Sequence, residues 1–306
     1  MVSPAQIKYL LSLIEKQSFQ RAAESCFVTQ PTLSMQIRKA EAAMGGQIIN
    51  RDTSPISLTS FGEMVIPQLE KIADDYNKLE DEIAKLKGTY KAEIRIGIIP
   101  TIAGYLVPDL YDQWQNQLGD IQLDIKELKT PDLIKAVEKK QIDFGVMAGP
   151  LKDQRFNQQR LFDEEIFVYS PKTKSKTISQ EKLQELKPWL LSEGNCLRTQ
   201  MINFCNLKQK HEDTWKYEGG SINMLLKMVE IQGGYTLVPS NYLPYLQLDK
   251  EDFKRVENIV PVRQIIGINL TRNSKKEHIQ GLIRLIQRNK SNDQLHKIKT
   301  EILPWS

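Results

Sequence analysis

The stretch SFQRAAESCFVTQPTLSMQIRKAE, residues 18–41, predicts two short helices joined by a tight turn. Ser18 is a suitable N-cap for the first helix, whose inner face contains the small residues Ala22 and Ala23. The second helix begins near Thr29, and Pro31 fits its first turn because the missing N–H has no intrahelical partner there. Its buried stripe is Leu33, Ile37, Ala40 and Met44. With the amphipathic helix that precedes it, this pattern predicts a helix-turn-helix.

The opposite face of the second helix carries amides, hydroxyls and basic side chains, which can reach base edges and phosphates in a DNA major groove. The candidates for DNA contact are Gln30, Pro31, Thr32, Ser34, Arg38, Lys39 and Arg51. Gln30 and Arg38 are the leading candidates for base edges, and Lys39 and Arg51 for phosphates. Six Lys and Arg against four acids in residues 1–62 form a weak electrostatic footprint, so we expect DNA binding to require a dimer. A three-helix cap with a solvated polar face remains the alternative.

A heptad repeat follows this segment. Its apolar positions alternate spacings of four and three and are Val65, Leu69, Ile72, Tyr76, Leu79, Ile83 and Leu86. A single helix packed on its own domain would also be amphipathic, but a strict repeat with charges between its apolar positions favours a coiled coil with a partner helix. Ser60 and Glu63 predict a capping box at its start, and Pro67 predicts a lost hydrogen bond or a kink.

After Gly88 strands alternate with helices. Buried or alternating strands are predicted at 93–101, 121–128 and 142–149, helices at 105–118 and 130–141, and further segments of this kind at 165–170, 188–194 and 233–239. Repeated βα units imply a mostly parallel sheet with helices on both faces. Ligands in such folds lie beyond the carboxyl ends of strands, which indicates Pro100–Thr101 and Lys129–Thr130. We expect two α/β subdomains with a cleft between them.

Length and composition narrow the class of protein. A chain of 306 residues with 40% apolar residues suggests about two domains with real cores, and a net charge of +4 is only mildly basic. No run reaches the ~18 apolar residues of a membrane span, and the first twenty residues lack a signal-peptide core, so we expect a cytoplasmic protein. Scattered His211, His278 and His296 without a CxxC motif argue against structural zinc; no metal or cofactor is expected.

The stretch LLSEGNCLRTQMINFC, residues 190–205, contains two of the three cysteines. Cys196 follows a turn that should open a helix, and the helix N-terminus and nearby Arg198 both favour the thiolate. In a continuous helix the Cα atoms of Cys196 and Cys205 would lie ~13 Å apart, whereas a disulfide needs them within ~7 Å. Oxidation of this pair would therefore require unwinding. The alternative is two ordinary thiols, with Cys205 packed on an apolar face and Cys196 exposed.

These residues resemble the LysR-type transcriptional regulators. Residues 18–41 and NRDTSPISLTSFG, residues 50–62, are similar to the winged helix-turn-helix of that family, although Ala40 stands where Leu is usual. IDFGVMAG, LFDEEIFVYS and MVEIQGGYTLVPS, beginning at residues 142, 161 and 228, resemble its effector-binding domain, so the resemblance covers essentially the whole chain.

The resemblance implies an α/β effector domain of two Rossmann-like subdomains, like periplasmic binding proteins, preceded by an all-α winged helix-turn-helix and a long linker helix. The implied domains are residues 1–60 for DNA binding, 61–88 for dimerisation and 89–306 for regulation. In the last of these, subdomain I covers about 89–164 plus 268–306, and subdomain II covers about 165–267.

The cysteine stretch is similar to that of the peroxide-sensing members of the family. The resemblance implies that Cys196 is the peroxidatic residue and Cys205 the resolving one, with peroxide bound near Thr101, Thr130, Asn195 and Arg263. Asn195 stands where the family often has His and Thr199 where it often has Asp, so we expect retained peroxide sensitivity with an altered rate. Cys26 is expected to be a small buried hydrophobe.

The sequence therefore predicts a transcription activator rather than an enzyme. Its expected partners are double-stranded DNA, RNA polymerase and further copies of itself up to a homotetramer, and hydrogen peroxide is the expected signal. One alternative is a regulator of the same family that responds to a small molecule in the cleft and has silent cysteines. Another is a thiol peroxidase with an accessory helical domain, which the helix-turn-helix and the heptads argue against.

Overall fold

The computed structural model divides into two units, Met1–Tyr90 and Lys91–Ser306, and each is described by itself. It describes residues 1–51, 53, 55–88, 92–117, 121–207, 220–271, 275–290 and 300–303. His211 and His296 lie outside the described residues. None of the helices in these ranges has the length and apolarity needed to cross a bilayer.

The first unit is built on three helices, α1 (Pro4–Lys16), α2 (Phe19–Ser25) and α3 (Gln30–Met44). Both predicted caps are confirmed, because the Ser18 side chain accepts from the Arg21 amide and the Thr29 side chain accepts from the Thr32 amide, each at 3.4 Å. The predicted stripe of α3 is buried except at Met44, which packs half-buried against the same core. Periodicity and capping are local features, which is why the sequence located these helices correctly.

Two short strands, β1 (Ile49–Asn50) and β2 (Ser57–Leu58), pair antiparallel beside the three helices and form the wing. The buried carboxylate of Glu41 holds the wing to α3, because it accepts from the backbone amides of Ile48 at 2.9 Å and Ile49 at 3.1 Å. Arg51 donates to the same carboxylate at 2.6 Å. The α3 end and the wing are therefore joined through one side chain.

The helix α4 spans Ser60–Leu86 and contains Pro67. Its cap is Thr59 rather than the predicted Ser60, because the Thr59 hydroxyl accepts from the Gly62 amide at 3.0 Å. Among the predicted heptad positions, Leu69 is buried in the core of the first unit. The positions from Ile72 onward are exposed in this chain: Ile72, Tyr76, Leu79, Ile83 and Leu86.

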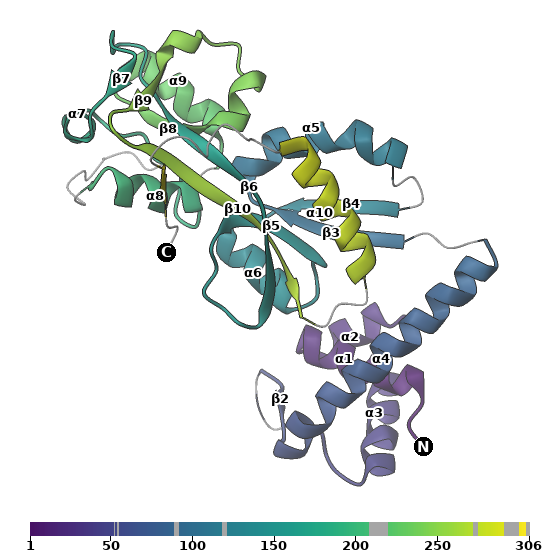
Figure 1. Ribbon diagram of the computed structural model, residues 1–306. Helices are drawn as coiled ribbons and strands as arrows, with labels where there is room; N and C mark the ends of the chain where they lie inside the picture. The colour runs from purple at the N-terminus through teal and green to yellow at the C-terminus, as the bar shows by residue number, and fades with distance from the viewer. Residues whose placement is uncertain are drawn as a thin grey trace. The chain divides into compact units, whose positions relative to one another are not determined.

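The second unit contains a nine-stranded sheet whose central strands differ from the prediction. β3 (Ala92–Ile98) is parallel to both β4 (Ile121–Glu127) and β5 (Phe144–Gly149). The long strand β10 (Val260–Leu270), however, is antiparallel to β5 and to β6 (Phe156–Tyr169). The expectation of a mostly parallel sheet is therefore wrong. The reason is that β10 brings the chain back from the second half to the first, as Figure 1 shows.

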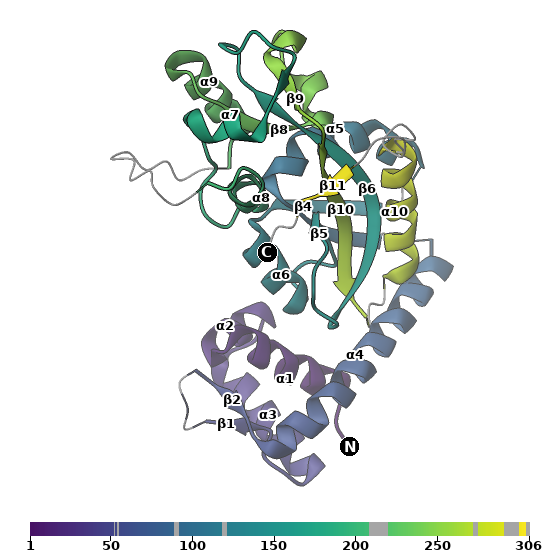
Figure 2. The ribbon, with the colours of Figure 1, turned by 60° about the vertical axis from the view of Figure 1, so that its left-hand side comes forward.

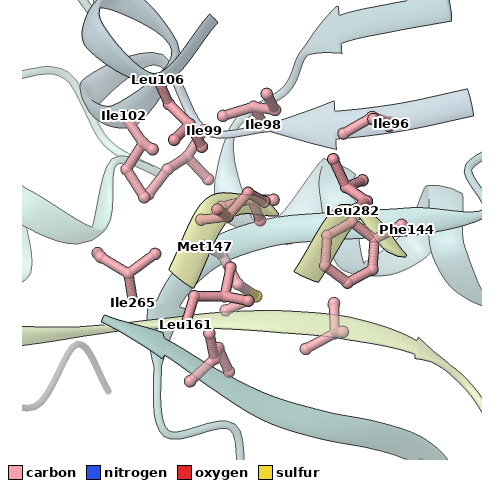
Figure 3. Close-up of a cluster of buried hydrophobic side chains, with 14 of the residues drawn as sticks. Ile96, Ile98, Ile99, Ile102, Leu106, Phe144, Met147, Leu161, Ile265 and Leu282 are labelled. Atoms are coloured by element: carbon pink, nitrogen blue, oxygen red, sulfur yellow. The ribbon is translucent and has the colours of Figure 1, made fainter. Parts of the chain in front are cut away.

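Helices cover both faces of this sheet. α5 (Pro100–Gln117) contacts α10 (Lys276–Lys290), whereas α6 (Thr130–Glu138) contacts β3, β5 and β10. Figure 2 shows α10 and α6 on opposite sides of the sheet. Figure 3 shows the core between the sheet and its helices, where Ile102 and Leu106 of α5 and Leu282 of α10 lie near strand side chains. α5 begins at Pro100 and not near Tyr105 as predicted, because proline is well tolerated in the first turn of a helix.

A second core lies beyond the middle of β6 and β10. It is enclosed by β7 (Thr177–Ile178), β8 (Thr236–Pro239), β9 (Phe253–Val256), α7 (Gln180–Glu185), α8 (Cys196–Phe204), α9 (Ile222–Gln232), the 3-10 helices η1 (Ser240–Tyr245) and η2 (Lys250–Asp252), and β11 (Thr300–Ile302). The segment 188–194 forms only an isolated bridge between Pro188 and Tyr235, so the strand predicted there is wrong. Pro188 has no N–H to donate to a ladder, which explains this.

Candidate functional site

The starts of three helices meet around Cys196, which is the first residue of α8 and is buried. The Thr130 amide, at the start of α6, donates to the carbonyl of Gly194 at 3.3 Å. Gly220 lies close to both Pro100, the first residue of α5, and Asn195, the residue before α8. A Cβ added to Gly220 would lie 3.2 Å from the Cβ of Pro100 and 3.4 Å from Asn195 Oδ1. The positive ends of three helix dipoles therefore point toward one region at the carboxyl ends of β3 and β5.

Arg263 is the buried cation of this region. Its Nη1 donates to Thr101 Oγ1 and its Nη2 donates to the Thr101 carbonyl, both at 3.0 Å. Its Nε donates to Glu164 Oε1 at 2.5 Å, and both side chains are fully buried. Glu164 also accepts from the Tyr105 hydroxyl at 3.0 and 3.1 Å and from Asn241 Nδ2 at 3.1 Å. The predicted residues Thr101 and Arg263 are thus brought together, and Glu164 joins them.

The electrostatic surroundings of the Cys196 sulfur differ from those expected. Burial raises the pKa of the Cys196 thiol, and this effect outweighs Arg263, the Thr130 hydroxyl and the backbone groups of Leu197 and Ala148, which lower it. The Arg198 guanidinium, expected to favour the thiolate, donates instead to the Leu191 carbonyl at 2.9 Å. Among the groups that lower the pKa of this thiol Arg263 has the largest effect, but burial has a larger effect in the opposite direction.

Asn195 Oδ1 has no hydrogen-bond partner among the described residues, whereas the Thr130 hydroxyl interacts with the Cys196 sulfur. The Asn195 amide is oriented by Ser192, because its Nδ2 donates to the Ser192 carbonyl at 2.9 Å and hydroxyl at 3.1 Å. Buried polar atoms are normally satisfied, so the open Asn195 oxygen indicates a place beside the sulfur for a small polar molecule with an O–H donor. The described residues contain no cluster of His, Cys, Asp and Glu side chains that could hold a metal ion.

Cys205 lies at the other end of α8 as its C-cap residue and is also buried. Burial raises its pKa to about 11, while the Tyr235 hydroxyl acts in the opposite direction. Since α8 is continuous from Cys196 to Phe204, nine residues at ~1.5 Å each separate the two cysteines by ~13 Å. Both cysteines are free thiols, and the helix between them would have to unwind before a disulfide could form.

The predicted DNA-contact residues lie on α3 and next to β1 in the first unit. Gln30, Pro31, Arg38 and Lys39 of α3 are exposed, whereas Thr32 and Ser34 are half-buried. The hydroxyl of Thr32 hydrogen-bonds that of Thr29 at 2.8 Å. Arg51 is exposed but forms an ion pair with Glu41, so it has a structural partner as well as a place beside α3. Cys26 is half-buried and packs against the core of this unit.

Sequence reasoning missed Glu164, Tyr105 and Asn241. Glu164 is the second residue of three consecutive acids in β6, Asp163, Glu164 and Glu165. Because side chains alternate along a strand, one of these acids had to point into the core, and that was the available signal. The partner of a buried acid, however, is not visible in the sequence when it lies 99 residues away, as Arg263 does.

Comparisons with known proteins place this arrangement among bacterial regulators. The family model "Bacterial regulatory helix-turn-helix protein, lysR family" matches residues 4–63, and the model "LysR substrate binding domain" matches residues 87–288.

A curated relative named "Hydrogen peroxide-inducible genes activator", from Pectobacterium carotovorum, is 28% identical over 298 residues, which cover 92% of this chain and 98% of the relative. The "DNA-binding transcriptional dual regulator OxyR" of Escherichia coli is 29% identical over 242 residues, covering 78% of this chain and 79% of that protein. A solved full-length OxyR variant from Pseudomonas aeruginosa has a TM-score of 0.72 at 25% identity and covers 94% of this chain and 98% of its own.

Proposed function

This chain belongs to the LysR family of bacterial transcriptional regulators, and we propose that it activates transcription when hydrogen peroxide oxidises Cys196 and a Cys196–Cys205 disulfide forms. The observation that carries this proposal is the position of Cys196. The residue lies at a helix start beside Arg263 and Thr130, with a second buried cysteine at the other end of the same helix. The likeness to relatives named for peroxide response supports it.

The chemistry needs only this chain and peroxide. The Cys196 thiolate attacks one peroxide oxygen, so that an S–O bond forms and the O–O bond breaks, and the departing hydroxide takes a proton to become water. The Cys205 sulfur then attacks the sulfenic sulfur, an S–S bond forms, and the S–O bond breaks to release a second hydroxide, which the proton of Cys205 converts to water. Two thiols and one peroxide give a disulfide and two waters.

The chain's own groups fit these steps. Asn195 Oδ1, which lacks a partner among the described residues, and the Thr130 hydroxyl beside the sulfur can accept the two peroxide hydrogens. Arg263 and the three helix starts stabilise the developing thiolate. Thr101 keeps the guanidinium in place through its hydroxyl and carbonyl oxygens. Because burial raises the pKa of the Cys196 thiol, loss of its proton contributes to the barrier for the reaction with peroxide.

Disulfide formation would remodel α8. The helix is held by three side-chain bonds to backbone carbonyls: Arg198 to Leu191 at 2.9 Å, Gln200 to Leu303 at 2.9 Å, and Gln180 to Phe204 at 3.2 Å. Closing ~13 Å to the ~7 Å that a disulfide allows is incompatible with the intact helix. A chemical event at one sulfur thereby becomes a conformational change in the second core.

The exposed face of α3 would bind double-stranded DNA, and the exposed heptad positions of α4 would pair with a second copy. Two such dimers would form the homotetramer that we propose, and the activated assembly would recruit RNA polymerase. The dimer compensates for the weak basic footprint of a single DNA-binding unit, because two half-sites double the number of phosphate contacts.

The experiment is peptide mass spectrometry of the reduced protein after seconds in micromolar hydrogen peroxide, with alkylation before and after reduction. We expect a Cys196–Cys205 disulfide in the wild type and in Cys26→Ser. We expect a stable sulfenic acid at Cys196 in Cys205→Ser and no oxidation in Cys196→Ser. Two fully alkylated thiols in the treated wild type would sink the proposal and favour a regulator that responds to a small molecule in the cleft.

A further inference from the structure

We infer that Glu164 is a positioning residue that fixes the Arg263 guanidinium at Thr101 and balances its charge, so that Cys196 stays protonated until peroxide arrives. The inference rests on the proposed function in taking Cys196 as the reactive thiol. Glu164 hydrogen-bonds Arg263, Tyr105 and Asn241, and we infer that it acts on the sulfur through Arg263.

The geometry of the pair carries the first step. Arg263 of β10 and Glu164 of β6 are directly paired in the antiparallel register, so the backbone sets their separation. The contact from Arg263 Nε to Glu164 Oε1 is 2.5 Å, and neither side chain is exposed. The remaining guanidinium nitrogens are used by Thr101. A guanidinium bound along two edges in this way has one orientation.

The surroundings of Glu164 hold its carboxylate in one orientation. The Tyr105 hydroxyl donates to both carboxylate oxygens, and Asn241 Nδ2 donates to Oε2. With Arg263, three side chains from α5, η1 and β10 therefore donate to one buried carboxylate. The ion pair places the Glu164 carboxylate directly against the guanidinium, so the two opposite charges partly cancel at atoms near Arg263.

The charges that face Cys196 make this balance important. Arg263 of β10 acts directly on the sulfur. Arg198, which lies on the same helix as Cys196, donates to the Leu191 carbonyl. The aliphatic part of the Lys129 side chain, just before α6, lies beside Gly194. Glu164 is the acid paired with Arg263, whose charge lowers the pKa of the Cys196 thiol. Without that acid, an unbalanced guanidinium in a low-dielectric region would favour the thiolate.

The test is the pH dependence of Cys196 alkylation by iodoacetamide in the reduced full-length protein, followed on the Cys196 peptide by mass spectrometry. We expect Glu164→Gln to keep the shape of the site and to lower the midpoint by about one pH unit, which is about tenfold more thiolate below both midpoints. Replacement of both charges, in Glu164→Gln with Arg263→Gln, is expected to raise the midpoint above that of the wild type. An unmoved or raised midpoint in Glu164→Gln would overturn the inference.

The matched control is Glu165→Gln, the next residue of β6, whose carboxylate pairs with Arg255 at 2.9 Å on the other side of the strand. Its alkylation midpoint should equal that of the wild type. A general loss of structure would shift the midpoint in both variants, so this control separates such a loss from the effect of the Glu164 charge. If Glu164→Gln does not fold, Tyr105→Phe gives a second reading and keeps the ring beneath Lys290, whose Nζ lies 4.9 Å from the centroid. Removing the donated O–H leaves more negative charge facing Arg263, so its midpoint should rise; a lowered or unmoved one would contradict the inference.

Peroxide is added in a separate arm with the same variants. The tenfold gain in thiolate is partly offset, because a thiolate whose pKa is lower is a weaker nucleophile. We therefore expect Glu164→Gln to form sulfenic acid about threefold faster than the wild type at neutral pH. If the variants shift the alkylation midpoint as expected but peroxide leaves Cys196 of the wild type reduced, the charge balance stands and the proposed function fails. If peroxide forms the disulfide but Glu164→Gln does not lower the midpoint, the proposed function stands and this inference fails.

Discussion

At the scale of single residues, burial decides the state of the candidate reactive thiol. Cys196 has a helix N-terminus and Arg263 beside it, yet desolvation raises the pKa of its thiol. Asn195, the residue before it, has its Nδ2 engaged by Ser192 and its Oδ1 without a partner among the described residues. Position 195 is therefore where one added donor would change the reaction most directly.

We expect Asn195→His to oxidise severalfold faster with peroxide at pH 7, because an imidazole N–H at this position can donate to the thiolate or to peroxide. Stopped-flow mixing followed by alkylation and mass spectrometry measures the rate. Thr199→Asp is the companion variant for the second departure from the family pattern. An unchanged rate in Asn195→His would remove position 195 from the candidate site.

A second residue-scale prediction concerns Asp143, which precedes β5. Burial opposes its ionisation, but hydrogen bonds from Arg95 and Lys275 outweigh burial and lower the pKa of Asp143 in the folded protein. Its contribution to the free energy of unfolding is therefore complete above the unfolded pKa of about 3.9 and is lost as the pH falls through the folded pKa. At neutral pH the carboxylate joins Arg95 of β3 to Lys275 before α10.

We expect Asp143→Asn to lower the free energy of unfolding by about 1–3 kcal/mol at pH 7 and by progressively less below pH ~4. Urea unfolding followed by tryptophan fluorescence measures this difference, since all four tryptophans lie after residue 91 and report on the second unit. Exposed Asp112→Asn is the control and should change little at either pH. A difference that stays constant with pH would show that the charge of Asp143 is not what stabilises the protein.

At the scale of elements, the stability of α8 should control the second chemical step. The proposed disulfide cannot form while residues 196–204 are helical, so helix opening precedes closure. Asn203 is an exposed residue of this helix, next to neither the Cys196 sulfur nor the core. Substitutions there can change helix propensity without disturbing packing.

Asn203→Ala should stabilise α8 and slow conversion of sulfenic acid to disulfide, and Asn203→Gly should do the opposite. Ala and Gly differ by about 1 kcal/mol in helix propensity, which corresponds to about a fivefold difference between the two rates. Trapping of the sulfenic acid with dimedone at successive times measures the conversion. The first step, oxidation of Cys196, should be equal in both variants. Equal conversion rates would mean that α8 need not open first.

At the scale of the whole molecule, α4 presents an uncovered apolar stripe from Ile72 to Leu86. Five large apolar side chains in heptad register on an otherwise charged helix favour association with a second helix of the same kind. The first unit carries too few basic groups for strong binding to DNA as one copy. Dimerisation through α4 and DNA binding should therefore be lost together.

We expect Leu79→Lys to shift the protein toward smaller assemblies in sedimentation velocity and to weaken DNA binding at least tenfold at 150 mM salt. The reason is that a charge replaces a seam residue and that the second half-site is lost. Asp81→Lys adds the same side chain at an exposed position on the side of the helix opposite the stripe and should leave assembly intact. Should Leu79→Lys assemble like the wild type, the coiled-coil interpretation of α4 would be wrong.

The sequence by itself determined whatever depends on neighbours along the chain. The starts of α2 and α3, the heptads of α4 and the spacing of Cys196 and Cys205 on one helix all follow from periodicity and capping over a few residues. The resemblance to LysR-type regulators rests on such local motifs, and the family models that match residues 4–63 and 87–288 confirm it.

Only the tertiary structure decided the direction of β10 and the contacts of Arg263. The Arg263 guanidinium reaches Glu164 across 99 residues and Thr101 across 162, and no local pattern encodes such distances. The protonated state of Cys196 belongs here too. Helix position and nearby basic residues are visible in the sequence and favour the thiolate, but desolvation depends on everything packed around the sulfur, and it is the larger effect.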